Sequence, residues 1–255
     1  MIEVKNLYKT FDGRDVLTDI CTQFEEGKTN LIIGQSGSGK TVLMKCLIGL
    51  YRAEKGSILY SGRDINTLDK KEYQQIQQEM GILFQGSALF DSMTVRENVM
   101  FPLTMLTDKS EKEKEDRVNF CLERVNLPNA HNLYPSQISG GMKKRVAIAR
   151  AIALNPKYLF CDEPNSGLDP KTSLVIDKLI YEITKEFNIT TVVNTHDMNS
   201  VMEIGESVSF IYQGKLWWRG SNNEILKTDN AEVHDFVYAS KYAKAMFASQ
   251  NNLKE

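Results

Sequence analysis

The sequence predicts an α/β fold that combines a largely parallel sheet with an added antiparallel sheet and an inserted helical segment. Short apolar, β-branched runs alternate with stretches of helical periodicity, which is typical of parallel α/β sheets. Two closely spaced strand-like runs, 2–7 and 16–24, indicate antiparallel pairing near the start. Between 87 and 153 the pattern is mainly helical, which predicts the inserted subdomain.

Each element is expected from its residue pattern. Runs rich in β-branched and aromatic residues, bounded by Gly, Asn or Asp, predict strands at 2–7, 16–24, 31–33, 56–62, 82–84, 158–161, 190–193, 208–211 and 215–218. Apolar residues three or four apart, or polar helix-forming runs, predict helices at 42–50, 70–79 and 173–187 and within 87–153. The charge run 108–117 is expected to be a solvated helix start.

We expect residues 1–220 to form one domain and residues 221–255 to form a helical tail. The tail carries apolar residues at helical spacing, which would pack on its own domain or reach a second copy. These residues are Val233, Phe236, Val237, Tyr242, Met246 and Phe247.

The composition is that of an ordinary globular protein. The 255 residues are enough for one well-packed body with a subdomain. Lys and Arg total 31 and Asp and Glu total 33, so the net charge is -2 and we expect no nucleic-acid partner. The four cysteines form no C-x-x-C pair, which disfavours zinc and disulfide sites. No run approaches the ~20 apolar residues that cross a bilayer, so another chain would have to do so.

A phosphate-binding loop is predicted between the strand at 31–33 and the following helix. The residues match G-x-x-x-x-G-K-[ST], a pattern whose backbone N–H groups can point at a polyphosphate. The helix that begins near Lys40 adds the positive end of its dipole. Lys40 would reach the β- and γ-phosphates, and Thr41 would bind Mg²⁺. The loop consists of Gly34, Gln35, Ser36, Gly37, Ser38, Gly39, Lys40 and Thr41.

Two carboxylates follow the apolar strand at 158–161. Asp162 is expected to hold the water shell of Mg²⁺, and Glu163 is expected to orient or deprotonate the attacking water. In isolation the pair would read as an exposed turn before Pro164. The phosphate loop upstream favours the catalytic interpretation.

Two further polar residues follow strands. His196 comes just after the strand near 190–195, at the edge of the sheet where ligands bind, and could hold the water and Glu163 in line with the γ-phosphate. Gln85 follows the strand at 82–84 and could offer its carbonyl to Mg²⁺. Either residue alone is more often structural.

Ser139, Gly140 and Gly141 precede a helix rich in Ala, Ile and Arg, and a helix start of this kind can bind an anion. With Ile138 and Met142 they resemble the signature motif of ABC-type ATPases. The usual motif has Leu and Gln at these two outer positions. The central three residues, which contact phosphate in that family, are intact.

The other motifs follow in the order seen in ABC ATPases, over about residues 2–220. The resemblance implies an ABC cassette with a RecA-like core that binds ATP and Mg²⁺ and hydrolyses ATP. It also implies a homodimer in which the signature of one subunit closes the site of the other, docked on integral membrane permease subunits. The remaining site residues implied are Asp169 in the D-loop, Thr195 as a nucleotide contact, and Phe11, with Tyr8 in reserve, under the adenine.

A narrower resemblance points to the ATPases of Mla-type lipid transporters. It rests on residues 83–103, on the lead-in Tyr134-Pro135-Ser136 and on Met142. One departure is Gly86-Ser87, where that branch more often has Ser-Gly. The resemblance implies an Mce-domain protein and a small regulatory subunit as partners, and a peripheral position at the cytoplasmic face of the inner membrane. The segment 84–101 would contact the permease, with Leu89, Phe90 and Met93 as the apolar patch.

Three alternatives remain open. A soluble ABC ATPase acting on DNA or ribosomes usually carries coiled coils, zinc elements or tandem cassettes, which this sequence lacks. A degenerate cassette that only senses nucleotide is disfavoured by the intact Lys40, Asp162, Glu163 and His196. A P-loop kinase or GTPase would not explain the Ser-Gly-Gly motif.

Overall fold

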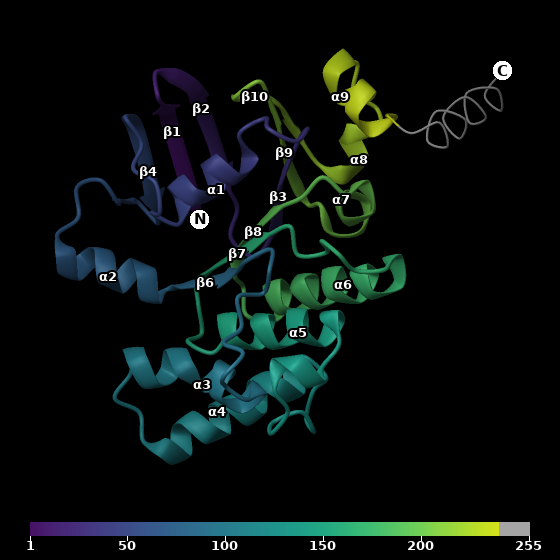
Figure 1. The fold of residues 1–255 in the computed structure, drawn as a ribbon. Coiled ribbons are helices and arrows are strands. Elements are labelled where there is room, and N and C mark those ends of the chain that lie inside the picture. The colour runs from purple at the N-terminus through teal and green to yellow at the C-terminus, as the bar shows by residue number, and fades with distance from the viewer. Residues whose placement is uncertain (240–255) are drawn as a thin grey trace.

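The computed structural model describes residues 1–239, and a six-stranded sheet forms its centre (Figure 1). Five strands run parallel to their neighbours, and the last strand pairs antiparallel at one edge. Across the sheet the strands are β10 (Lys215–Gly220), β9 (Ser207–Tyr212), β3 (Thr29–Ile33), β8 (Thr190–Asn194), β7 (Tyr158–Asp162) and β6 (Met80–Leu83). The predicted parallel core is confirmed.

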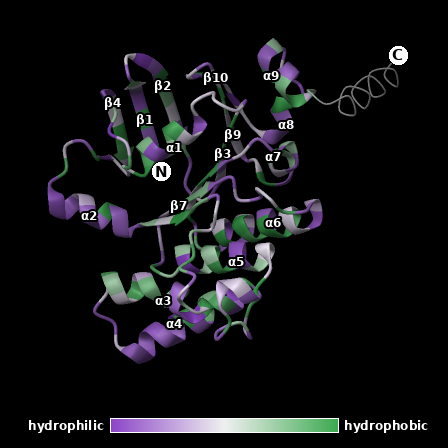
Figure 2. Ribbon diagram, viewed as in Figure 1, coloured by the Kyte–Doolittle hydropathy of each residue, from purple (hydrophilic) through white to green (hydrophobic). Residues whose placement is uncertain are grey.

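Both faces of this sheet are buried. In β3, Leu31 and Ile33 belong to one apolar cluster and Ile32 belongs to the other. The same alternation places Leu159 and Phe160 of β7 on opposite faces. Successive side chains of a strand point to opposite faces, so a continuous apolar run is what a sheet covered on both sides requires. In Figure 2 the helices α2 (Lys70–Gln78) and α4 (Glu111–Arg124) are by contrast largely hydrophilic.

A four-stranded antiparallel sheet lies beside the core. Its strands, in order, are β2 (Arg14–Phe24), β1 (Ile2–Phe11), β4 (Lys55–Tyr60) and β5 (Arg63–Asp64). Asp12 and Gly13 connect β1 to β2 and have φ of 48° and 76°. Two positive φ angles in a two-residue loop are typical of the tight hairpin turn that suits the twist of paired strands. The predicted antiparallel sheet is confirmed.

Helices cover both faces of the core sheet (Figure 1). The longest, α6, buries Ile176, Ile180 and Ile183 in the core, as its apolar spacing predicts. The helices that flank the sheet are α1 (Lys40–Leu47), α2 (Lys70–Gln78), α6 (Pro170–Glu186) and α7 (Met198–Ile204).

The segment between β6 and β7 is helical, as expected. Helix α4 begins with a capping box between Ser110 and Glu113, so the charge run 108–117 contains the start of a helix, and most of the run is exposed although Lys114 is buried. The elements of this segment are α3 (Val95–Leu106), α4 (Glu111–Arg124), the 3-10 turn η1 (Pro135–Gln137) and α5 (Gly140–Ala151). They lie together on one side of the core sheet (Figure 1).

Two short helices, α8 (Asn222–Ile225) and α9 (Ala231–Val237), end the described part of the chain. Val233 and Val237 are buried, and the ring of Phe236 lies 5.3 Å from that of Phe210 in β9. This part of the tail therefore packs on its own domain. The rest of the predicted stripe, Tyr242, Met246 and Phe247, lies outside the described residues, and a role in dimer contact stays a prediction.

Within residues 1–239 no helix is both long and apolar enough to cross a bilayer.

Candidate active site

The loop 34–41 connects β3 to α1 and is packed tightly against its surroundings. Gly34 has φ of 147°, and a Cβ there would collide with the carbonyl oxygen of Ile211. Gly39 has φ of 107°, and a Cβ there would lie 2.8 Å from the Cδ2 atom of Leu17. Only glycine fits these two positions, because a side chain would clash with neighbouring atoms and because the positive φ angles disfavour other residues.

Lys40 is buried at the start of α1 and points back across the loop. Its Nζ donates hydrogen bonds to the carbonyl oxygens of Gly34, at 2.9 Å, and Gln35, at 3.0 Å. Burial lowers the pKa of this ammonium, while the carboxylates of Glu163 and Asp162 raise it in part. A partly desolvated cation inside a ring of backbone groups is well suited to binding phosphate oxygens.

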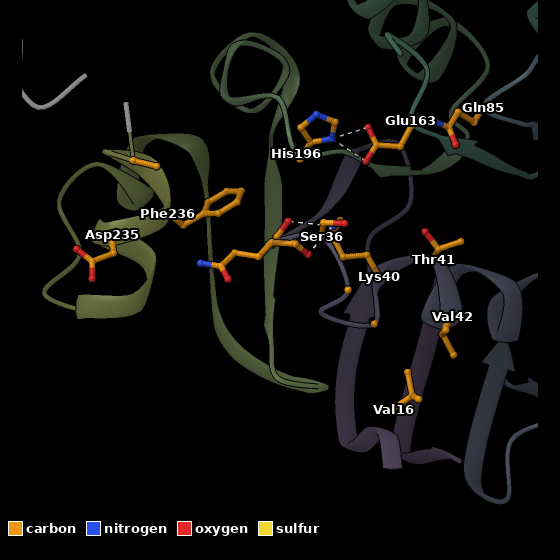
Figure 3. Close-up of a pocket in the computed structure, with 15 residues that line it drawn as sticks. Val16, Ser36, Lys40, Thr41, Val42, Gln85, Glu163, His196, Asp235 and Phe236 are labelled. Atoms are coloured by element: carbon orange, nitrogen blue, oxygen red, sulfur yellow. Dashed lines mark hydrogen bonds and ion pairs between the residues drawn. The ribbon is translucent and has the colours of Figure 1, made fainter. Parts of the chain in front are cut away.

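A cavity of about 810 Å³ opens over this loop (Figure 3). Gln85, Glu163 and His196 line it from the carboxyl ends of β6, β7 and β8. These neighbouring parallel strands end at the same edge of the sheet, which is where ligands bind in open α/β sheets. The sequence-predicted loop, glutamine, glutamate and histidine are thus brought together. Phe236 and Asp235 of α9 add a wall that the sequence did not indicate.

Glu163 and His196 form a pair. The Nδ1 atom of His196 lies 2.9 Å from the carboxylate of Glu163, whose side chain is 16% exposed, against 68% for the histidine. Glu163 has φ of 47°, an uncommon conformation for a residue with a side chain, and its N–H donates to the carbonyl oxygen of Asn194 at 2.9 Å. Strain of this kind tends to occur at functional sites, where surrounding contacts hold it.

Asn194 is a residue that sequence reasoning missed. Its Nδ2 donates to the carboxylate of Asp162, at 2.5 Å, and to the hydroxyl of Thr41, at 3.3 Å. Its own Oδ1 is buried and has no hydrogen-bond partner among the described residues. Its signal in the sequence is only that it precedes Thr195-His196 at the end of an apolar strand.

These residues fit Mg²⁺. A hydroxyl, a carboxylate and an orphaned amide oxygen make a hard oxygen donor set, and Mg²⁺ is usually held by one or two carboxylates together with substrate phosphates. Among the described residues no group of three or more His, Cys, Asp and Glu side chains could hold a metal ion. A magnesium ion beside Thr41 and Asp162 would therefore need phosphate oxygens to complete its coordination.

Gln85 connects this site to the helical segment. Its side-chain Nε2 donates to the hydroxyl of Ser166 at 3.1 Å, and its backbone carbonyl oxygen accepts from the Nζ of Lys144 in α5. Arg150, further along α5, donates to the carbonyl oxygens of Ser87 and Ala88 at 2.8 and 2.7 Å. Two cations of α5 therefore hold the backbone that follows β6.

Ser139, Gly140 and Gly141 start α5 but line a different cavity, of about 450 Å³, together with Asp169. Ser139 is the N-cap, and its hydroxyl accepts from the N–H of Met142 at 3.2 Å. A Cβ at Gly141 would lie 2.7 Å from the Cγ2 atom of Thr172, so a larger residue here would have to displace that side chain. The Ser139 helix start and the loop 34–41 thus line separate cavities of one copy.

The model of the family described as "ABC transporter" matches residues 17–166, which include the phosphate loop, the signature and the acid pair. The chain belongs to the ABC transporter family. The cassette fold predicted from the sequence, with its added antiparallel sheet and helices, is therefore confirmed, as is its class as an ABC transporter ATPase.

Three curated ABC relatives illustrate the similarity. A probable ribonucleotide transport ATP-binding protein mkl of Mycobacterium leprae is 38% identical over 92% of this chain and 68% of its own length. A methionine import ATP-binding protein MetN of Campylobacter jejuni is 37% identical over 95% and 77%. The intermembrane phospholipid transport ATP-binding protein MlaF of Haemophilus influenzae is 36% identical over 100% and 97%. The chain spans about two thirds of the mycobacterial relatives that it matches.

A solved ABC structure shows the same fold. A dimeric ATP-binding cassette in a post-hydrolysis state, bound to ADP and Pi, is 32% identical, with a TM-score of 0.78 over 87% of this chain and 99% of that one.

Three further residues expected at the site are not among those that line the cavity over loop 34–41. Phe11 is 37% exposed and packs edge-on against Tyr51 at 5.2 Å. Thr195 is buried, and its hydroxyl accepts from the N–H of Asp197 at 3.1 Å. Asp169 caps α6 by accepting hydrogen bonds from Thr172, and these bonds lower the pKa of the Asp169 carboxyl. Their nucleotide and D-loop roles stay predictions.

Proposed function

We propose that two copies of this chain bind MgATP between them and hydrolyse it to power a membrane permease. One observation carries the proposal: the phosphate loop and the Ser139 helix start line separate cavities of one copy. In this proposal each of the two cavities is one half of a phosphate site. A second copy, turned to face the first, would supply the missing half to each site. The dimeric cassette of similar fold supports this arrangement.

The proposed hydrolysis depends on charge and positioning. Lys40 and the amides of loop 34–41 would hold the phosphates, and Thr41 and Asp162 would hold Mg²⁺, which would neutralise charge on the phosphate oxygens. Glu163 would take a proton from water or orient it, and His196 would keep that carboxylate aimed at the γ-phosphate. Ser139 and its glycines from the other copy would bind the same phosphate.

We further propose a phospholipid as cargo. The MlaF relative matches along nearly its whole length, 97%, whereas the mkl and MetN relatives extend well beyond the match, which covers 68% and 77% of them. The turn at Ser87 adds support. Ser87 has φ of 63°, a conformation that favours glycine, so the Ser-Gly order of the Mla-type branch would fit the same turn. In this proposal an Mce-domain protein and a small regulatory subunit complete the transporter at the cytoplasmic face of the inner membrane.

The surface proposed to contact the permease is only partly apolar. Phe90 is 40% exposed, and its ring lies 4.8 Å from that of Phe101. Leu89 packs against the core and is half-buried. Phe84, at the end of β6, is also exposed and extends the patch.

Two experiments test these proposals. The ATPase activity of Glu163→Gln tests the general base, and normal turnover in that variant would contradict the assignment.

A tagged pull-down in mild detergent with mass spectrometry tests the cargo. Recovery of a permease together with an Mce-domain protein is expected. Recovery of a permease of another class would contradict the lipid proposal and leave the ATPase mechanism standing, and recovery of nucleic acid or ribosomes in place of a permease would contradict the transport proposal itself.

A further inference from the structure

Three polar side chains meet beneath the loop that follows Glu163. The Nδ2 atom of Asn165 donates to Asp177 at 2.9 Å and to the Oγ of Ser200 at 3.0 Å. The hydroxyl of Ser200 in turn donates to the other carboxylate oxygen of Asp177 at 2.9 Å. We call these three residues the Asn165–Asp177–Ser200 cluster. It joins the loop after β7, the middle of α6 and the first turns of α7.

The cluster is costly to bury. Asp177 is 1% exposed and Ser200 is fully buried, on helices whose neighbouring positions, Ile176 and Val201, belong to the apolar core. Desolvation raises the pKa of the Asp177 carboxyl to about 6, although the hydrogen bonds from Ser200 and Asn165 lower it in part. A buried carboxylate is usually no more stabilising than a well-packed apolar residue. Core stability alone therefore does not account for an acid at this position.

The position of the cluster relative to Glu163 and His196 does account for the buried acid. Asn165 is two residues after Glu163, and Ser200 is four residues after His196. On one side of the Glu163–His196 pair, the hydrogen bond from the Glu163 N–H to the Asn194 carbonyl already ties the two segments together. The cluster ties the same two segments on the other side. The 2.9 Å contact between Glu163 and His196 thus lies between two tethers.

Apart from the hydrogen bond that Gln85 donates to Ser166, the loop after Glu163 has few other restraints. Within it, Ser166 N–H donates to the Glu163 carbonyl and Leu168 N–H to the Asn165 carbonyl, both at 3.1 Å. These are turn contacts inside the loop and do not anchor it to α7. A cavity of about 640 Å³ separates the loop from the start of α7, so packing does not fill the gap.

We propose that Asn165, Asp177 and Ser200 are positioning residues that hold the Glu163 loop and the start of α7 in register, so that Glu163 and His196 stay in contact during hydrolysis. This inference rests on the proposed roles of Glu163 and His196. The cluster does not contact the phosphate loop, so its loss acts on the chemical step. Nucleotide binding by Lys40 and Thr41 is left intact.

The test is the steady-state ATPase activity of the purified full chain over a range of ATP concentrations. Asp177→Leu removes both carboxylate oxygens that accept hydrogen bonds in the cluster. Ser200→Ala is a milder change, and it serves as the test if the leucine variant does not fold. We expect kcat to fall by about fivefold or more in both, with KM changed less than about twofold. Asp177→Asn keeps one acceptor for the Asn165 amide and recovers most of the lost kcat.

Thr184→Val is the matched control. Thr184 lies two turns further along α6 and also loses buried hydrogen bonds, to Ile180 and Thr191, at the far end of β8. It is expected to lose stability and keep kcat. Equal kcat losses in Thr184→Val and Ser200→Ala, or a kcat within about twofold of the unaltered chain in both cluster variants, would overturn the inference. Glu163→Gln is measured in parallel. Normal turnover in Glu163→Gln would contradict both the proposed base and this inference. Lost turnover in Glu163→Gln together with normal turnover in the cluster variants would contradict this inference alone.

Discussion

The imidazole of His196 contacts the carboxylate of Glu163 at 2.9 Å, and the two residues come from the ends of adjacent parallel strands. The glutamate side chain is 16% exposed and the histidine side chain is 68% exposed, so an exposed imidazole holds a largely buried carboxylate. The pair should therefore act as a unit.

A double-mutant cycle tests this unit. Glu163→Gln alone is expected to lower kcat by about 10²–10⁴ because it removes the proton acceptor. His196→Ala alone should lower kcat as well, and the double variant should be little worse than Glu163→Gln, since residues that act together are not additive. The measurement is kcat for the four proteins. Additive losses would show that the two side chains act independently.

Lys40 is expected to control ATP affinity. Lys40→Met removes charge-assisted hydrogen bonds, worth about 1.5–3 kcal/mol, so the dissociation constant of a non-hydrolysable ATP analogue should rise about tenfold or more. Calorimetric titration measures it. Lys45→Met is the control on the same helix, because the Lys45 Nζ lies 5.3 Å over the Tyr51 ring and does not line the cavity. Equal weakening by both variants would count against a specific phosphate contact.

Asn194 is expected to support magnesium binding. Asn194→Ala removes the donor that holds Asp162 and Thr41, and the Mg²⁺ concentration for half-maximal ATPase activity should rise about tenfold or more. Asn30→Ala provides a control. It deletes a buried amide at the opposite end of the same sheet, where Asn30 donates to the carbonyls of Glu25, Lys28 and Thr191. That variant should lose stability and keep its Mg²⁺ dependence.

The stability of the fold should depend on pH through Asp177. Its folded-state pKa is raised to about 6, mainly by burial, with Asp197 and Glu203 as further acidic neighbours and Glu163 and His196 on the same cavity. The folded state thus binds this proton more tightly than the unfolded state does. The stabilising contribution is fully present below about pH 4 and is lost as the pH rises through about 6.

The matching variant is Asp177→Asn, which does not titrate. Relative to it, the unaltered chain should lose up to about 3 kcal/mol of unfolding free energy between pH 4 and 7. Urea unfolding at several pH values measures this difference. A constant difference across that range would contradict the titration of Asp177.

Local sequence patterns were enough to predict most of the helices and strands. The Leu31-Ile32-Ile33 run, the glycine loop and the Ile176–Ile183 spacing each determine their element through neighbours in the sequence, so they could be predicted. Asn194 could not be found in this way. Its importance arises from Thr41, 153 positions away, which only the folded sheet brings within reach. The same holds for Asn165, Asp177 and Ser200, whose types are ordinary in a loop and on helix surfaces.

In the site, too, residues in local motifs could be predicted, whereas residues brought in by the fold could not. Motif residues with a fixed local geometry, such as the loop 34–41, converge on one cavity with Glu163 and His196. Phe11 was expected under the adenine because it is an aromatic residue of the first strand–turn region; its ring packs on Tyr51 at 5.2 Å, and its adenine contact stays a prediction. Phe236 reaches the cavity from more than 190 positions beyond the phosphate loop, and no local pattern could reveal that.

The separation of the phosphate loop from the Ser139 helix start has a genetic consequence. If each catalytic site takes one half from each subunit, a copy with a defective Lys40 still offers an intact Ser139, and a copy with a defective Ser139 still offers an intact Lys40. A mixed pair then contains one wholly intact site and one doubly defective site. Two alleles that are each inactive alone should therefore complement one another when they are expressed in the same cell.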